Sequence, residues 1–186
     1  MKRIDWNGVE AASSAPKLPP GGYVCQIVRA EDVPGKEYVA FYPEIVQGEH
    51  RGFFKKFFDA LDFWAVKHIR SYKEKAQPFF KEFYELLEAS NSGFKWDGVS
   101  ESQFVGKGVG LVFGFEEYKK KSGDIGQRLY VAATVTPDDI RAGKFTVPDL
   151  KTLDAQKASK PAETNADASD DFFAIDQDLD DGDLPF

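Results

Sequence analysis

Apolar and polar side chains alternate in several short stretches of the chain, a pattern typical of strands that bury one face. The first stretch begins near residue 23, and a second is predicted over about residues 37–46. Pro43 cannot donate a hydrogen bond to a neighbouring strand, so we expect the second strand to be exposed or bulged there. The residues that share the apolar faces of these two strands are Tyr23, Cys25, Ile27, Val39, Phe41 and Ile45.

Three further strands and one helical region follow along the chain. A third strand is predicted over residues 51–58, a fourth over 105–118 and a fifth over 127–136. Between the third and fourth, residues 62–89 carry apolar side chains at helical spacing, and Pro78 splits this region into two helices or opens the second of them. The fourth strand is rich in glycine, which allows strong bending.

The order of these elements is three strands, a helical insert and two strands. It is the order of an OB-fold, a five-stranded and partly open barrel that often carries oligonucleotides. We therefore predict a mainly β fold with α elements, an OB-fold-like barrel over residues 21–150 that follows a lead-in over residues 1–20. Lys119, Lys120 and Lys121 would form the tip of the hairpin between strands four and five.

The net charge of −7 is unevenly distributed along the 186 residues. Residues 1–150 contain 21 basic and 21 acidic side chains, whereas residues 151–186 contain three basic and ten acidic ones. The acidic excess therefore lies at the end of the chain. Residues 1–150 carry no net charge, so the acidic total does not argue against nucleic-acid binding by this part of the chain. Because the end of the chain shows no apolar periodicity, we predict a flexible linker over residues 151–169 and a disordered acidic tail over residues 170–186.

The last seven residues carry a specific motif. Their sequence, Asp-Asp-Gly-Asp-Leu-Pro-Phe, resembles the acidic tip of bacterial single-stranded DNA-binding proteins, which ends in an aliphatic residue, Pro and a terminal Phe. In that family the tip docks on replication and repair proteins. The chain length, the strand order and the Pro-Pro-Gly-Gly-Tyr sequence at residues 19–23 resemble phage-encoded single-stranded DNA-binding proteins. The helical insert departs from the bacterial pattern, so the DNA contacts of that family are not carried over.

The resemblance implies that the tip recruits partner proteins, and the chemistry of the tip agrees. One pocket can bind both the ring and the carboxylate of a terminal Phe, and the aspartates favour encounter with basic surfaces. The alternative is a solubilising acidic tail, although such a tail needs no apolar end. The residues predicted to bind partners are Asp180, Asp181, Asp183, Leu184, Pro185 and Phe186.

Positive charge and aromatic rings, which bind phosphates and bases, are interleaved over residues 51–81. Three tyrosines that lie opposite the apolar faces of their strands are the best candidates for stacking on bases. Two alternatives stay open, namely that the phenylalanines of residues 53–58 belong to the core and that the lysine tip is a solvated turn. The residues predicted to contact single-stranded DNA are Tyr38, Tyr42, Arg51, Lys55, Lys56, Phe57, Lys119, Lys120, Lys121, Arg128 and Tyr130.

Other classes of function find little support in the sequence. The two histidines and the single cysteine form no pattern with metal-site spacing, so we expect neither enzyme activity nor a metal or cofactor. No apolar run approaches the ~20 residues of a membrane helix, and a cytoplasmic location is expected, that of the host for a phage protein. The predicted function is to bind and protect single-stranded DNA during replication, recombination or repair. An adaptor or DNA mimic whose barrel binds protein is the alternative, and the oligomeric state, a homo-oligomer included, is left open.

Overall fold

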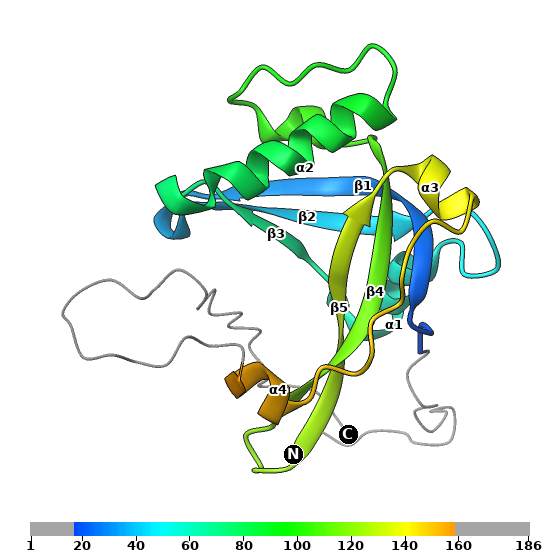
Figure 1. Ribbon diagram of the computed structural model, residues 1–186, viewed down its shortest axis with the longest axis vertical. Helices are drawn as coiled ribbons and strands as arrows, with labels where there is room; N and C mark the ends of the chain where they lie inside the picture. The colour runs from blue at the N-terminus through cyan, green and yellow to red at the C-terminus, as the bar shows by residue number, and fades with distance from the viewer. Residues whose placement is uncertain (1–16, 159–186) are drawn as a thin grey trace, which may run out of the picture.

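The computed structural model describes residues 17–158, whose elements are arranged as Figure 1 shows. The strands are β1 (Gly21–Val33), β2 (Tyr38–Ile45), β3 (His68–Ser71), β4 (Gly108–Lys119) and β5 (Ile125–Val135). The helices are α1 (Phe53–Leu61), α2 (Gln77–Ser90), α3 (Pro137–Arg141) and α4 (Leu153–Ala158). Short 3-10 turns occur at Pro34–Lys36, Glu74–Ala76 and Glu101–Phe104.

The strands of this part of the chain form one antiparallel sheet of order β3-β2-β1-β4-β5. Strands β3 and β5 are the edges of the sheet, which is therefore open. Helix α2 lies between β3 and β4 in the sequence. The prediction of a mainly β fold with α elements is confirmed, and so is the insertion of a helix between the third and fourth strands.

The prediction of a strand over residues 51–58 is wrong, because this part of the chain forms helix α1. Four phenylalanines occupy positions 53, 54, 57 and 58, and this spacing places them on one side of a helix. Strand alternation would instead have separated neighbouring phenylalanines onto opposite faces. The sequence therefore contained the helical signal, in the spacing of the apolar residues.

A carboxylate from β2 fixes the start of α1. The side chain of Glu44 accepts hydrogen bonds from the backbone N–H groups of Phe54 (3.1 Å) and Lys55 (2.6 Å), and also from that of Ile45 (2.7 Å). The first N–H groups of a helix lack partners within the helix, and the helix dipole favours negative charge at this end. Glu44 is buried and thus serves the fold.

The helix predicted over residues 62–89 is only partly present. Residues 68–71 form the edge strand β3, and the helix is confined to α2. Pro78 stands in the first turn of α2, which confirms the prediction that it opens a second helix. Val66 and His68 are buried on either side of the exposed Lys67, so a short alternation marks β3 in the sequence.

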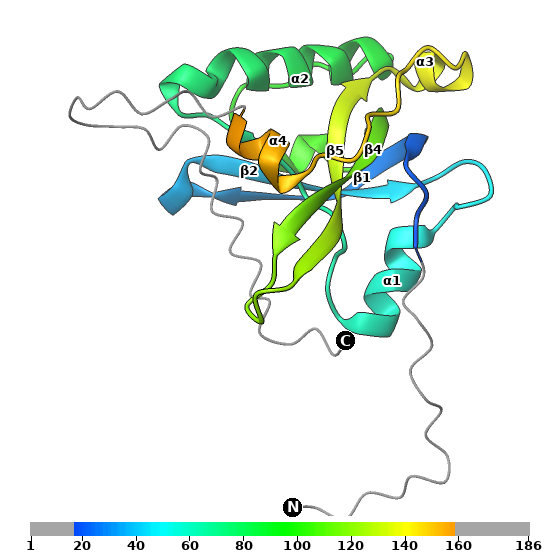
Figure 2. The same cartoon turned by 60° about the horizontal axis from the view of Figure 1, so that its bottom comes forward.

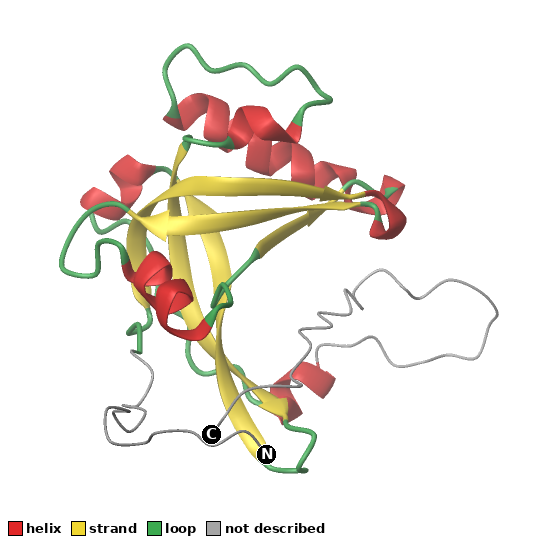
Figure 3. Ribbon diagram, turned by 180° about the vertical axis from the view of Figure 1, so that it is seen from behind, coloured by secondary structure: helices red, strands yellow, loops and turns green. Residues whose placement is uncertain are grey.

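Aromatic side chains fill the core from two sides. Phe41 of β2 packs against Phe80 and Phe83 of α2, with ring centroids 6.3 and 4.9 Å apart. Phe54 of α1 packs against Phe113 of β4 at 5.6 Å. As Figure 3 shows, α1 and α2 lie on opposite sides of the β1–β2 strands. The sheet and these two helices therefore enclose one hydrophobic core.

The glycines of β4 make room for the chain that follows the sheet. A Cβ atom at Gly110 would lie 2.7 Å from Cγ1 of Ile140 and 2.7 Å from the carbonyl oxygen of Thr136. A Cβ atom at Gly114 would lie 2.6 Å from Cγ of Pro148. From the sequence, we interpreted these glycines as positions where the strand bends. In the structure, Gly110 and Gly114 instead allow α3 and the segment after it to pack closely on β4.

Ordered chain continues past residue 150. Lys151 donates its backbone N–H to Phe115 (3.0 Å) and accepts from Glu117 (2.9 Å), both in β4, and α4 follows. Figure 2 shows α4 beside the β4–β5 hairpin. The linker predicted from residue 151 therefore does not begin before the end of α4. The rest of that linker, the acidic tail with its six predicted partner-binding residues, and residues 1–16 lie outside the described part of the chain.

Candidate nucleic-acid interface

The outer face of β1 and β2 carries the predicted stacking residues of β2. Val39 and Phe41 are buried in the core, so the alternate residues of this strand point away from it. Strand pairing places Arg29 of β1 opposite Tyr42. Lys67, just before β3, reaches the same place. We call the following residues the β1–β2 surface: Arg29, Glu31, Tyr38, Tyr42 and Lys67.

A bulge in β1 turns Arg29 toward this surface. The pairing steps from Ile27 opposite Pro43 to Arg29 opposite Tyr42, which leaves Val28 as the extra residue. Without this residue, alternation after the buried Ile27 would direct Arg29 to the core face. The prediction that β2 is exposed or bulged at Pro43 is therefore wrong, because Pro43 is buried and the extra residue lies in the neighbouring strand β1.

Tyr42 is enclosed by charged neighbours. Cζ of Arg29 lies 4.4 Å and Nζ of Lys67 lies 5.4 Å from the centroid of its ring. Its hydroxyl donates a hydrogen bond to Oε2 of Glu31 (2.8 Å), and the residue is only 5% exposed. Burial and this hydrogen bond raise the pKa of Tyr42 to about 12. The hydrogen bond and the guanidinium of Arg29 lower the pKa of Glu31. In this arrangement cations, rather than solvent, cover the ring.

An aromatic strip adjoins the β1–β2 surface and consists of Trp64 and Phe58. The ring of Trp64 lies 6.2 Å from that of Tyr42 and 5.7 Å from that of Phe58, which is 38% exposed. Its indole Nε1 donates to the carbonyl oxygen of Pro43 (3.0 Å). The position of Trp64 depends on the chain reversal between α1 and β3, which the pattern of apolar residues does not predict.

The predicted cations of residues 51–56 lie on and just before α1. Arg51, Lys55 and Lys56 are exposed, and Nζ of Lys55 pairs with Asp59 at 3.0 Å. Phe57 is half-buried and packs against two other phenylalanine rings at 6.1 and 5.1 Å. Phe57 therefore borders the core, as the alternative interpretation of these phenylalanines allowed.

The predicted lysine tip is confirmed in position. Lys119 ends β4, and Lys120 and Lys121 follow in the turn before β5. The backbone N–H of Lys120 donates to the carbonyl of Asp124 (2.8 Å), which closes the hairpin. The three lysine side chains are exposed. The turn therefore presents positive charge to solvent.

Two further predicted residues lie on the β4–β5 hairpin and meet the chain that follows the sheet. Arg128 pairs with Glu116 across the hairpin, with Nε 2.8 Å from Oε1. Nζ of Lys151 lies 5.8 Å from the ring centroid of Tyr130. In the sheet, β5 is separated from β2 by β4 and β1. The structure therefore does not bring Tyr130 together with Tyr42.

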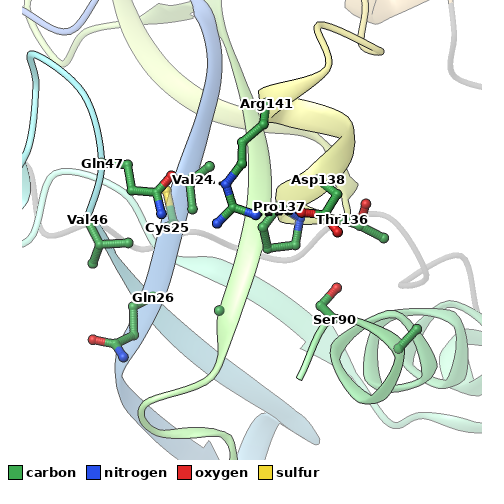
Figure 4. Close-up of a pocket in the computed structure, with 12 residues that line it drawn as sticks. Val24, Cys25, Gln26, Val46, Gln47, Ser90, Thr136, Pro137, Asp138 and Arg141 are labelled. Atoms are coloured by element: carbon green, nitrogen blue, oxygen red, sulfur yellow. Dashed lines mark hydrogen bonds and ion pairs between the residues drawn. The ribbon is translucent and has the colours of Figure 1, made fainter. Parts of the chain in front are cut away.

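A cavity of about 330 Å³ opens between β1, α3 and the C-terminal end of α2 (Figure 4). Arg141 at its rim is held by hydrogen bonds to Oε1 of Gln47 (3.2 Å) and to Oδ1 of Asp138 (2.5 Å). None of the predicted DNA-contacting residues lines this cavity. It is therefore distinct from the β1–β2 surface.

Within residues 17–158, no group of three or more His, Cys, Asp or Glu side chains could hold a metal ion. No helix in the same range is long and apolar enough to cross a membrane. The chain matches no known family in a comparison with protein-family models and no protein in a search of curated sequences. Function is therefore inferred from the chemistry of the surface.

Proposed function

We propose that this chain binds single-stranded DNA on the β1–β2 surface and the adjoining aromatic strip. One observation carries the proposal, namely that cations and aromatic rings gather on the outer face of a curved sheet. Arg29 and Lys67 offer positive charge to phosphates, and Tyr38 and the strip offer rings to bases, the combination that sequence-tolerant binding requires. Lys55 and Lys56 of the neighbouring helix α1 add further charge.

The proposed architecture is an OB-fold that is open between β3 and β5. The order β3-β2-β1-β4-β5 is the strand order of such a barrel without the pairing between β3 and β5. Helix α2 takes the place of the helix between strands three and four. OB-folds bind oligonucleotides on the face of strands two and three and with the loop between strands four and five. The lysine tip, Lys119 to Lys121, stands in that loop.

The proposed role is non-catalytic. The body would coat single-stranded DNA with little sequence preference during replication, recombination or repair. Residues 170–186 would recruit proteins of the same processes, as their resemblance to the tip of bacterial single-stranded DNA-binding proteins implies. The resemblance to phage-encoded proteins favours a bacteriophage as the source.

A titration of labelled oligonucleotides tests the proposal. Single strands should bind more tightly than duplex of the same sequence, and log K should fall with log salt by roughly 0.7 per phosphate contact. Lys67→Gln should weaken binding, whereas Lys81→Gln, which removes the same charge from the exposed side of α2, should not. Equal affinity for duplex, or affinity independent of salt, would contradict the proposal and favour a barrel that binds protein.

A further inference from the structure

The surroundings of Tyr42 favour a contact other than stacking on a base. Two groups contact the Glu31 carboxylate, and the positive charge of a third, Lys67, lies near enough to lower the pKa of Glu31. Arg29 forms an ion pair with Oε2 of Glu31, and the hydroxyl of Tyr42 donates to the same oxygen at 2.8 Å. The ammonium group of Lys67 lies over the ring of Tyr42, 5.4 Å from its centroid. A single anionic group thus occupies the centre of the β1–β2 surface.

We propose that Arg29, the Tyr42 hydroxyl and Lys67 form a subsite for one phosphodiester group of the DNA, and that Glu31 occupies it in the free protein. This inference rests on the proposed function. Phosphate oxygens accept hydrogen bonds from the same donors as a carboxylate, and the guanidinium group can bind either anion through two N–H groups. Tyr42 then contributes its hydroxyl to the interface, while base stacking is left to Tyr38 and the aromatic strip.

The contacts of Glu31 are weak enough for a phosphate to replace them. The side chains of Arg29 and Glu31 are 58% and 44% exposed, and water screens ion pairs at such positions. Glu31 is two residues from Arg29 on the same face of β1, so rotation of its side chain into solvent requires no movement of the strand. The phosphate that replaces Glu31 belongs to a DNA strand whose neighbouring nucleotides contact other residues of the surface. These contacts raise the effective concentration of the phosphate at the subsite.

Charge-removing variants of the full chain test the subsite. Glu31→Gln should tighten binding to labelled oligothymidylate about fivefold at low salt, because the competing carboxylate is gone. Glu49→Gln is the matched control, since it removes the same charge from an exposed turn. Arg29→Gln should weaken binding and reduce the slope of log K against log salt by roughly 0.7. In the Arg29→Gln background, Glu31→Gln should tighten binding less than it does in the wild type, because one of the groups that Glu31 contests is absent.

The outcomes separate the subsite from the proposed function. Equal effects of Glu31→Gln and Glu49→Gln, weaker binding after Glu31→Gln, or a gain that is just as large without Arg29 would each overturn the subsite and leave DNA binding intact. Absence of binding to oligothymidylate by the wild type and every variant would overturn both. Melting temperatures measured for each variant allow affinity to be expressed per folded molecule.

Discussion

His68 places an uncharged imidazole in the core between β3 and α2. Its ring centroid lies 4.9 Å from that of Phe83, the residue is 6% exposed, and its Nε2 atom has no hydrogen-bond partner. Burial, and next the positive charge of Arg70, lower the pKa of His68 well below 6.5. Protonation is therefore much less favourable in the folded than in the unfolded chain.

This difference predicts a loss of stability in acid. The contribution of His68 is fully present above pH 6.5, the unfolded value, and is lost as the pH falls toward the lower folded value, because only the unfolded state takes up the proton. The free energy of unfolding should fall by up to about 1.4 kcal/mol per pH unit below 6.5. Urea denaturation between pH 5 and 8 should show a smaller fall for His68→Gln than for the wild type or His50→Gln. An unchanged pH dependence in His68→Gln would refute the prediction.

Of the two predicted stacking residues on β2, Tyr38 is partly exposed, whereas Tyr42 is buried. It pairs with Ser71 at the outer end of β2, away from the cations that enclose Tyr42. Tyr38→Ala should weaken single-stranded DNA binding by about 1–3 kcal/mol, the usual contribution of one stacked base. Tyr38→Phe keeps the ring and should bind as the wild type does. A loss of melting temperature with unchanged affinity per folded molecule would instead assign Tyr38 to a structural role.

At the scale of elements, α3 can pack on the sheet because position 110 has no side chain. An added methyl group there would meet the backbone of Thr136 as well as the side chain of Ile140, so the helix would have to shift. Gly110→Ala should lower the free energy of unfolding by about 1–3 kcal/mol. Gly35→Ala is the matched control, because nothing lies within 4 Å of its added Cβ atom. Denaturant unfolding of both variants measures the difference, and equal stability would contradict this explanation of Gly110.

The sequence predicted those elements whose signal is local. Alternating side chains were enough to find β1, β2, β4 and β5, and Pro78 marked the start of α2. Residues 53–58 are apolar enough for a strand or a helix, and only the spacing of the four phenylalanines indicates helix α1. Its cap could not be foreseen, since Glu44 reaches α1 from another element.

The candidate surface was less predictable than the fold, because its residues meet through tertiary structure. Alternation placed Tyr38 and Tyr42 on the outer face correctly. Arg29 joins them only through the bulge at Val28, and a one-residue shift of this kind has no clear sequence signal. Alternation also predicts that Tyr130 lies opposite the apolar face of its strand, but alternation does not give the sheet order, which separates β5 from β2.

At the scale of the whole molecule, charge separates the body from the end of the chain. Residues 1–150 have no net charge, and residues 170–186 contain seven aspartates. If this segment is the disordered tail that its composition predicts, it will compete with DNA for the cations of the body, because the tether keeps its local concentration high. Deletion of residues 170–186 should leave DNA affinity intact or increase it, most strongly at low salt, where screening is weakest. Changing the seven aspartates to asparagine should reproduce the effect, and failure to do so would exclude charge as its cause.

Removal of Phe186 alone separates partner recruitment from this competition. The shortened chain still ends in a carboxylate, so its charge and its DNA affinity should hardly change. A partner pocket that binds the terminal ring and the carboxylate together would no longer find the ring. The variant should therefore not capture replication or repair proteins from a host lysate. A synthetic peptide of residues 170–186 should displace the same proteins from the wild type, whereas a peptide without Phe186 should not. If every captured protein were retained by the shortened chain, the tail would act through its charge alone, as a solubilising segment does.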